Sequence, residues 1–235
     1  MDRLVSLITG ASSGIGRCLA EKMCGRGYLV VGVGRNVDAL EELAEKYPEC
    51  FRYVAADLVE PSSLDRVEDV VRELGGLNVL VNNAGFGLAK PVLGHSEEEV
   101  EALFLVNAVR PIQLILRLVR YMSEGGVVVN VVTAGVHVLM KDFPIYGASK
   151  SALSYASKVF RDELRGRGIH LVEVYPGPVK TRFFERAGVK TPLTAVSAEK
   201  VAEAILRAVE KKRKTVYVPF PLRLLSVFGP LPFKA

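Results

Sequence analysis

Short apolar runs alternate with longer amphipathic segments along the chain, and this alternation constrains the fold more than any other feature. Runs of near-continuous apolar character are typical of parallel strands covered by helices on both faces. We expect seven strands, at Leu4–Thr9, Leu29–Val33, Phe51–Ala55, Val79–Val81, Val127–Val132, Leu171–Tyr175 and Thr215–Val218. We expect helices between them at Gly14–Arg26, Val37–Lys46, Leu64–Leu74, Ser96–Met122, Tyr146–Arg167 and Ala198–Lys211. This order predicts an α/β fold in which residues 1–235 form a single doubly wound domain, with a seven-stranded, mainly parallel sheet and helices on both faces.

The composition argues against several other classes of protein. A net charge of +5 over 235 residues is modest, and much of the excess lies in residues 211–214 at the end of an expected helix. Cations there complement the helix dipole, and no aromatic side chains interleave them, so nucleic-acid binding is disfavoured. No segment predicts a membrane span, because the most apolar candidate, Val216–Phe233, contains four prolines and Arg223.

The three cysteines, Cys18, Cys24 and Cys50, are odd in number and lack CxxC spacing. We therefore expect no disulfide framework and no metal site, and we expect a reducing, cytoplasmic location. Because a glycine motif begins as early as Thr9, we expect no signal peptide.

The first expected strand runs into the turn Thr9-Gly10-Ala11-Ser12-Ser13-Gly14-Ile15-Gly16, which opens the first expected helix. Glycines let the backbone approach a pyrophosphate, and the helix N-terminus supplies free N–H groups and a positive dipole end. An ordinary glycine-rich turn has the same composition, but the strand–turn–helix context favours a Rossmann dinucleotide site. We expect cofactor contacts from Gly10, Ser12, Ser13, Gly14, Ile15 and Gly16.

The second expected strand ends in Val33-Gly34-Arg35-Asn36, with no acidic residue before Asp38. An acid at this place accepts the ribose 2′-hydroxyl of NAD, whereas an arginine suits the 2′-phosphate of NADP. The alternative is that Arg35 is an ordinary surface residue that binds no cofactor. We expect Arg35 and Asn36 to contact the cofactor and NADP(H) to be preferred over NAD(H).

Two more turns follow strands at the edge where such sheets bind ligands. They are Asp57-Leu58 and Asn82-Asn83-Ala84-Gly85. Asp57 is a candidate partner of the adenine amino group, and the second turn can lie beside the adenine ribose. Each is by itself more often a plain turn than a site. We include Asp57, Leu58, Asn83, Ala84 and Gly85 among the cofactor contacts.

Tyr146 and Lys150 lie one helical turn apart, 13 residues beyond Thr133, which follows the fifth expected strand. A phenol with a pKa of about 10 exchanges protons poorly near neutrality. An ammonium about 4 Å away would favour the phenolate by about three pKa units, before desolvation takes part of this back. Tyr146 would then act as acid or base near pH 7, with Thr133 orienting the substrate oxygen. A surface Tyr and Lys would share this spacing, so spacing alone does not decide.

After the sixth expected strand, prolines and a glycine predict a rigid turn, and we expect nicotinamide contacts from Pro176, Gly177, Val179 and Thr181. Residues 182–196 have loop character and predict a substrate lid. The tail, residues 219–235, is apolar and proline-rich. It could close over the substrate pocket, cover a subunit interface, rest on a membrane surface as a peripheral contact, or pack on its own domain.

Taken in this order, the motifs resemble those of the short-chain dehydrogenase/reductase family, from Leu4 to about Val218. The resemblance implies NAD(P)-dependent carbonyl–alcohol chemistry, a homodimer or homotetramer, and a catalytic Asn-Ser-Tyr-Lys tetrad. The Tyr and Lys roles fall on Tyr146 and Lys150, which also contact the cofactor in that family. The Asn role falls on Asn107, whose backbone carbonyl would hold a water of the proton relay. The serine position holds Thr133, which keeps the hydroxyl but adds a methyl that narrows the pocket.

These observations predict an NADP(H)-dependent oxidoreductase that interconverts a ketone or aldehyde and an alcohol, with Tyr146 as general acid/base. The alternative is a non-catalytic NADP-binding sensor or interaction protein on the same fold. The partner is a small-molecule carbonyl or alcohol whose identity the sequence does not give.

Overall fold

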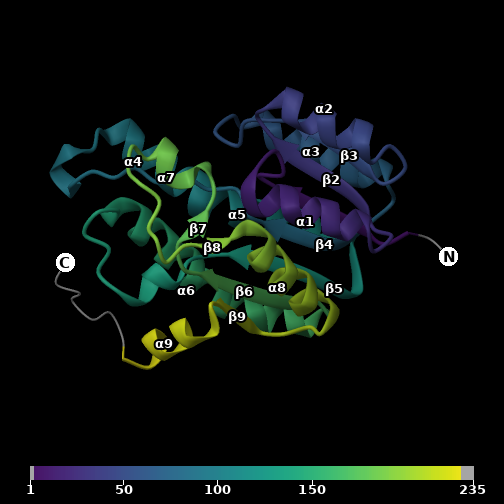
Figure 1. Ribbon diagram of the computed structural model, residues 1–235. Coiled ribbons are helices and arrows are strands. Elements are labelled where there is room, and N and C mark those ends of the chain that lie inside the picture. The colour runs from purple at the N-terminus through teal and green to yellow at the C-terminus, as the bar shows by residue number, and fades with distance from the viewer. Residues whose placement is uncertain (1–2, 229–235) are drawn as a thin grey trace.

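The computed structural model describes residues 3–228 and is built on one seven-stranded sheet, with the strand order β3-β2-β1-β4-β5-β6-β9 (Figure 1). Every neighbouring pair in it is parallel, which confirms the doubly wound α/β fold. The strands are β1 (Val5–Thr9), β2 (Leu29–Gly34), β3 (Phe51–Ala55), β4 (Leu77–Asn82), β5 (Met122–Val131), β6 (His170–Pro176) and β9 (Thr215–Val218). The order reverses between β1 and β4, so a crevice opens outside their carboxyl ends.

Helices cover both faces of this sheet, each through a separate apolar core (Figure 1). One face carries α1 (Gly14–Cys24), α2 (Val37–Lys46) and α8 (Ala198–Glu210), and the other carries α3 (Ser62–Glu73), α5 (Arg110–Leu118) and α6 (Pro144–Gly166). The strands between these layers are buried on both sides, which explains why they read as unbroken apolar runs.

The single helix expected at Ser96–Met122 is wrong in its middle and at its end. A capping box of Ser96 and Glu99 starts α4 (Glu97–Phe104), a π-helical turn η2 (Leu105–Val109) interrupts it before α5, and a 3₁₀ turn η3 (Val119–Tyr121) ends it. Pro111 has no N–H to donate to the carbonyl of Asn107 four residues earlier, so a regular α-helix cannot continue there. Consequently Asn107 lies at the break.

By length and composition, the stretch Glu97–Tyr121 is the one helical segment among residues 3–228 that could cross a membrane. Half of its most apolar window is buried inside the protein, and Leu114, Ile115 and Leu118 pack in the core beneath the sheet. Its apolar character is therefore accounted for by internal packing.

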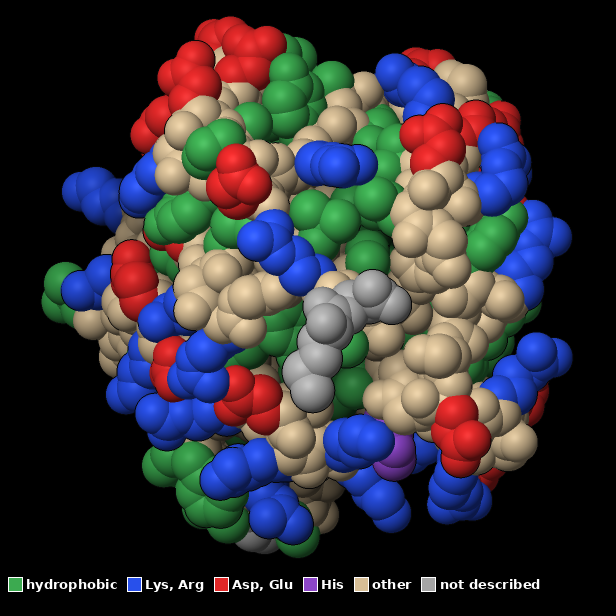
Figure 2. All heavy atoms as spheres, turned by 90° about the vertical axis from the view of Figure 1, so that its right-hand side faces the viewer, with side chains coloured by type: hydrophobic (Ala, Val, Ile, Leu, Met, Phe, Trp, Pro, Cys, Tyr) green, Lys and Arg blue, Asp and Glu red, His purple; other side chains and the backbone are tan. Residues whose placement is uncertain are grey.

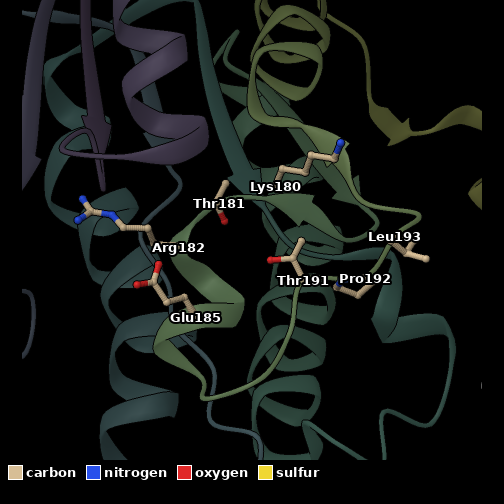
Figure 3. A pocket seen from close by; sticks show the side chains of 7 residues that line it. All are labelled: Lys180, Thr181, Arg182, Glu185, Thr191, Pro192 and Leu193. Carbon is tan, nitrogen blue, oxygen red and sulfur yellow. The ribbon is translucent and has the colours of Figure 1, made fainter.

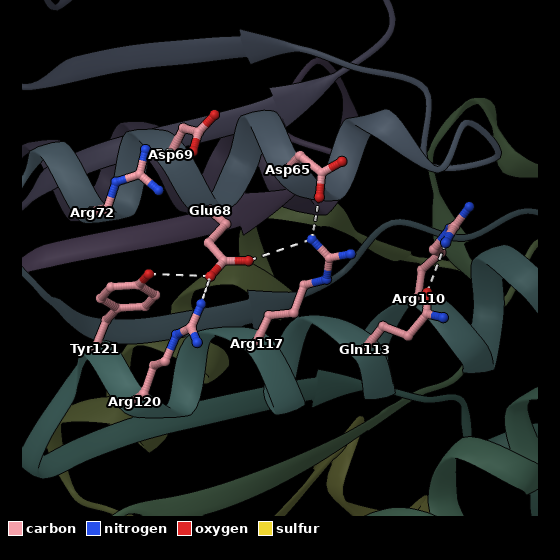
Figure 4. A network of polar contacts seen from close by, with 9 residues as sticks. All are labelled: Asp65, Glu68, Asp69, Arg72, Arg110, Gln113, Arg117, Arg120 and Tyr121. Atoms are coloured by element: carbon pink, nitrogen blue, oxygen red, sulfur yellow. Dashed lines mark hydrogen bonds and ion pairs between the residues drawn. The ribbon is translucent and has the colours of Figure 1, made fainter.

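Polar contacts join α3 to α5 and η3, with Glu68 at their centre (Figure 4). Arg117 and Arg120 contact its carboxylate, and the Tyr121 hydroxyl donates to it over 3.1 Å. Burial raises the pKa of Glu68, but the hydrogen bonds and charges of these partners outweigh burial and leave it lowered. The network holds α5 in a fixed position relative to the sheet.

Arg110, at the start of α5, makes further hydrogen bonds that reach the edge of the crevice. Its side chain is buried, and it donates to the carbonyl oxygens of Leu58 (2.5 Å) and Val59 (2.8 Å). The loop after β3 is thereby held at the carboxyl edge of the sheet, next to the crevice.

Charges on the face seen in Figure 2 are mixed, with Lys and Arg dispersed among Asp and Glu. Residues 211–214 follow α8 directly and are exposed. The modest positive balance is thus spread over solvated surface, and this face carries no broad patch of one sign.

Candidate active site

A cavity of about 1040 Å³ lies at the crevice and extends from the turn after β3 to the C-terminal segment. All but two of the expected site residues line it. These are Gly10, Ser12, Ser13, Gly14, Ile15, Arg35, Asn36, Asp57, Leu58, Asn83, Ala84, Gly85, Thr133, Tyr146, Lys150, Pro176, Gly177, Val179 and Thr181. Gly16 and Asn107 are buried and do not line the cavity.

One hydroxyl joins the carboxyl ends of β1 and β4. Thr9 Oγ1 accepts from the backbone N–H groups of Asn83 and Ala84, both at 3.0 Å, and donates to the carbonyl of Val81 at 3.3 Å. The Asn83 side chain returns a hydrogen bond to the carbonyl of Thr9 (2.9 Å). The glycine turn and the Asn-Asn-Ala-Gly turn are therefore fixed against each other.

The glycine turn brings backbone close to the cavity. Gly10 has φ +72°, and a Cβ there would lie 2.9 Å from Nδ2 of Asn83, so no larger residue fits. A Cβ on Gly16 would lie 2.2 Å from the carbonyl oxygen of Gly10. The lack of a side chain at Gly16 thus allows α1 to pack closely on the turn. We expected Gly16 to contact the cofactor directly, but it does not line the cavity.

The N-terminus of α1 faces the same space. Its N-cap, Ser13, makes no side-chain cap hydrogen bond, and the first turn contains no acidic residue. The free N–H groups and the positive dipole end suit a phosphate. Asn36, by contrast, caps α2 by accepting from the backbone N–H of Ala39 (3.1 Å), so its side chain is already engaged.

Arg35 and Asp57, which follow β2 and β3, form an ion pair of 3.4 Å at one end of the cavity. Their side chains are 65% and 38% exposed, and so open a pair contributes little to stability. Arg35 can therefore leave Asp57 and bind a phosphate instead with little loss of stability.

The lid is more ordered than the loop expected at 182–196. It contains a short helix, α7 (Arg182–Arg186), and its two ends are joined by pairing of β7 (Val179–Lys180) with β8 (Val196–Ser197). Figure 3 shows Arg182 extending from the start of α7, away from the side chains of Lys180 and Leu193.

Two lid arginines line the cavity and were not foreseen: Arg182 and, one helical turn later, Arg186. Burial lowers the pKa of Arg186, and so do the nearby charges of Arg182 and Arg35. Three cationic side chains thus gather at one end of the cavity. The i,i+4 arginines are visible in the sequence, but only the fold places them beside Arg35.

Tyr146 lies at the start of α6, in the middle of the cavity. Burial raises the pKa of its phenol, and a hydrogen bond with Thr133 opposes this only in part. The lowering of the Tyr146 pKa expected from Lys150 is absent from the structure, and the ammonium group of Lys150 donates instead to the carbonyl of Val131 at 2.9 Å. Burial therefore dominates and keeps the phenol protonated.

Lys150 is itself only 3% exposed, and burial lowers its pKa to about 8. Thr133 is buried beside the turn after β6: its Oγ1 donates to the carbonyl of Pro176 (3.3 Å) and accepts from the N–H of Gly135 (3.1 Å). The three polar groups that carry the expected chemistry line the same cavity.

Asn107 lies behind that group and is fully buried. Its amide exchanges two hydrogen bonds with the backbone of Phe86 (2.9 and 3.1 Å) and donates to Ser149 Oγ (3.1 Å). The side chain therefore fastens the loop after β4 to α6. Its backbone carbonyl lacks an α-helical donor because residue 111 is proline, a signal present in the sequence that the helix expectation overlooked.

Comparisons with known sequences and structures all point to the same protein family. The sequence model of the family described as short chain dehydrogenase matches residues 4–192. A fatty acyl-CoA reductase of Mycobacterium tuberculosis is 31% identical, covering 95% of this chain and 80% of that protein. A short-chain dehydrogenase from Sphingobium yanoikuyae in complex with NADPH superposes with a TM-score of 0.87 at 27% identity, covering 96% and 92% of the two chains. One from Burkholderia phymatum in complex with NAD gives 0.86 at 20% identity, covering 100% and 98%, and shares the fold.

The buried charge of Lys150 predicts a stability cost. Its folded pKa of about 8 lies below the unfolded value of 10.5, so the unfolded chain binds more protons between these values and stability rises with pH across that window. We expect Lys150→Met to raise the free energy of unfolding at pH 7 by about 3 kcal/mol, with the gain falling below about 1 kcal/mol at pH 10. Urea unfolding at both pH values measures this.

Lys200→Met, at an exposed lysine on α8, is the matched control and should be neutral at both pH values. A Lys150→Met protein that is less stable than wild type at pH 7 would contradict the assignment of a buried, destabilising charge.

Proposed function

The chain belongs to the short-chain dehydrogenase/reductase family, and on this basis we propose that it is an NADP(H)-dependent oxidoreductase that interconverts a ketone or aldehyde and an alcohol. The observation that carries the proposal is the convergence of Thr133, Tyr146 and Lys150 in one cavity with the glycine turn. The neighbouring Sphingobium structure holds NADPH, which supports a cofactor of this class.

The charges that line the cavity fit a phosphate-rich cofactor. Four side chains are cationic, Arg35, Lys150, Arg182 and Arg186, against one acid, Asp57. A 2′-phosphate adds up to two negative charges to those of the pyrophosphate, and the arginines at the adenosine end are suited to receive it. We propose that Arg35 and Arg186 hold this phosphate and that the N-terminus of α1 holds the pyrophosphate.

The residues of the chain have separate tasks in the proposed reaction. When bound, the nicotinamide supplies or takes up the hydride. Tyr146 donates the proton to the carbonyl oxygen, and its raised pKa keeps it in the protonated form that this step needs. Thr133 orients that oxygen, and the ammonium of Lys150, which lines the same cavity, binds the ribose next to the nicotinamide. The backbone carbonyl of Asn107 is positioned to hold a water that returns a proton.

The second candidate is a binding protein without catalytic activity on the same fold. A dinucleotide sensor could use Lys150 to hold the cofactor, but it has no use for the phenol of Tyr146 and the hydroxyl of Thr133 in the same cavity. The presence of these two groups beside Lys150 favours the enzymatic interpretation.

The exposed face of α6 supports a homo-oligomer. Ala148, Ala152, Tyr155 (75%) and Val159 (52%) are exposed along it, and Leu116 (61%) is exposed on α5. We propose that this face pairs with a second copy.

The cysteines are free thiols, which agrees with the cytoplasmic location we propose.

We expect sedimentation to give at least twice the monomer mass, and Tyr155→Glu to shift the protein toward monomer, because a charge would be buried in the paired face. A wild-type protein that sediments as a monomer at micromolar concentration would exclude this pairing.

Cofactor preference is tested by removing the arginines at the adenosine end. The double variant Arg35→Ser, Arg186→Ala should raise KM for NADPH by about 10²- to 10⁴-fold, because each of the two charge-assisted hydrogen bonds contributes about 1.5–3 kcal/mol. KM for NADH should change less than threefold. Arg213→Ala, an exposed arginine beyond α8, is the control. Equal or better wild-type kcat/KM with NADH would overturn the NADP(H) assignment.

Proton transfer is tested at Tyr146 and Thr133. Tyr146→Phe should lower kcat/KM by about 10²- to 10⁴-fold, as expected for loss of a general acid. Thr133→Ala should cost about 10- to 100-fold, whereas Thr133→Ser, which keeps the hydroxyl, should stay near wild type. Steady-state NADPH oxidation measures all three. Near-wild-type turnover by Thr133→Ala would remove Thr133 from the mechanism.

A further inference from the structure

The lining of the cavity has a charged part, where Arg35, Arg182 and Arg186 lie near one another, and an apolar part. The apolar part, called the apolar half below, comes from residues 86–88, 102–106 and 134–143 and from the tail segments η5 (Phe220–Leu224) and α9 (Leu225–Phe228). Among the described residues, these segments contribute only apolar side chains and glycines to the lining. The catalytic hydroxyls and Lys150 are then the polar groups that a substrate meets here.

The lid helix α7 follows the same division. Arg182 and Arg186 line the charged part, whereas the Phe183 ring lies 5.1 Å from the Tyr146 ring and 5.7 Å from the Phe143 ring, centroid to centroid. A carbonyl group at Tyr146 is therefore flanked by aromatic surface, and the described residues of the apolar half add no polar side chain that could pair with an additional hydroxyl or charge of the substrate.

The far wall of the apolar half is the tail, which is packed in place. Leu222 lies against Gly177, where a Cβ would come within 2.8 Å of its Cδ1, and it packs on the cluster that contains Tyr175 and Tyr217. These two rings stack at 4.8 Å, and the Tyr217 hydroxyl lies 3.0 Å from Nε2 of His137. The tail is thus anchored beside the turn after β6, and two of its side chains, Leu222 and Leu225, reach the cavity.

We propose that the substrate is an apolar carbonyl compound or its alcohol, polar only at the reacting oxygen, and that Leu222 and Leu225 of the tail form the surface that selects it. This inference rests on the proposed function for the place of the oxygen. The rest follows from burial: each CH₂ transferred from water into such a pocket gains affinity by about fourfold, and a hydroxyl left without a partner loses affinity.

The test is a series of straight-chain aldehydes, from butanal to decanal, with NADPH. We expect kcat/KM to rise by about two- to fourfold per methylene until the wall is reached. Leu225→Asp should lower kcat/KM for decanal at least tenfold while changing butanal less than threefold. The matched control is Leu224→Asp, on the same segment but 63% exposed and outside the cavity lining, which should leave both unchanged.

Binding is measured separately, by displacement of the uncharged dye Nile red with alkan-1-ols of the same lengths. Turnover that does not depend on chain length would overturn the apolar substrate class and leave the proposed function standing. Absence of turnover, together with displacement that strengthens with length and is weakened by Leu225→Asp, would support the apolar pocket and overturn the proposed function. No length dependence in either assay would overturn the inference.

Discussion

The hydroxyl of Thr9 is the contact on which the arrangement of the site depends. Parallel strands bring their carboxyl ends to one edge of the sheet, but a crevice is useful only if the turns beyond those ends are fixed. Thr9 accepts from two backbone N–H groups of the turn after β4 and donates back into that strand. The glycine turn, the Asn83–Gly85 turn and the N-terminus of α1 therefore form one rigid unit around the cavity.

The chemistry of the site depends on where its charged side chains lie in the cavity. The cationic side chains of Arg35, Arg182 and Arg186 lie near one another at one end of the cavity. The part of the cavity lined by the tail is apolar. A single ammonium, Lys150, is buried at a cost to stability that its lowered pKa reports. A buried cation with a shifted pKa in a cavity is typical of a functional site. The break of the helix at Asn107, imposed by Pro111, leaves the backbone carbonyl of Asn107 without an α-helical donor behind the cavity.

Much of this could be predicted from local pattern. Strands, the glycine turn and the Tyr146–Lys150 pair are encoded in adjacent residues, so their placement along one edge followed from the alternation of strand and helix. Three features could not be found in this way. Arg186 belongs to a segment without periodicity, Leu222 to a tail whose docking depends on a long-range contact with Gly177, and the pKa of Tyr146 depends on burial. Their roles arise from tertiary packing, which spacing along the chain does not report.

The central claim is that a phosphate-rich dinucleotide and an apolar carbonyl compound meet at Tyr146. It is tested most directly with decanal and NADPH that carries deuterium at both C4 positions of the nicotinamide, followed by mass spectrometry of the alcohol. The account predicts one deuterium on the carbinol carbon with wild-type protein and loss of the product with Tyr146→Phe. Alcohol without deuterium, or full activity of the Tyr146→Phe protein, would contradict it.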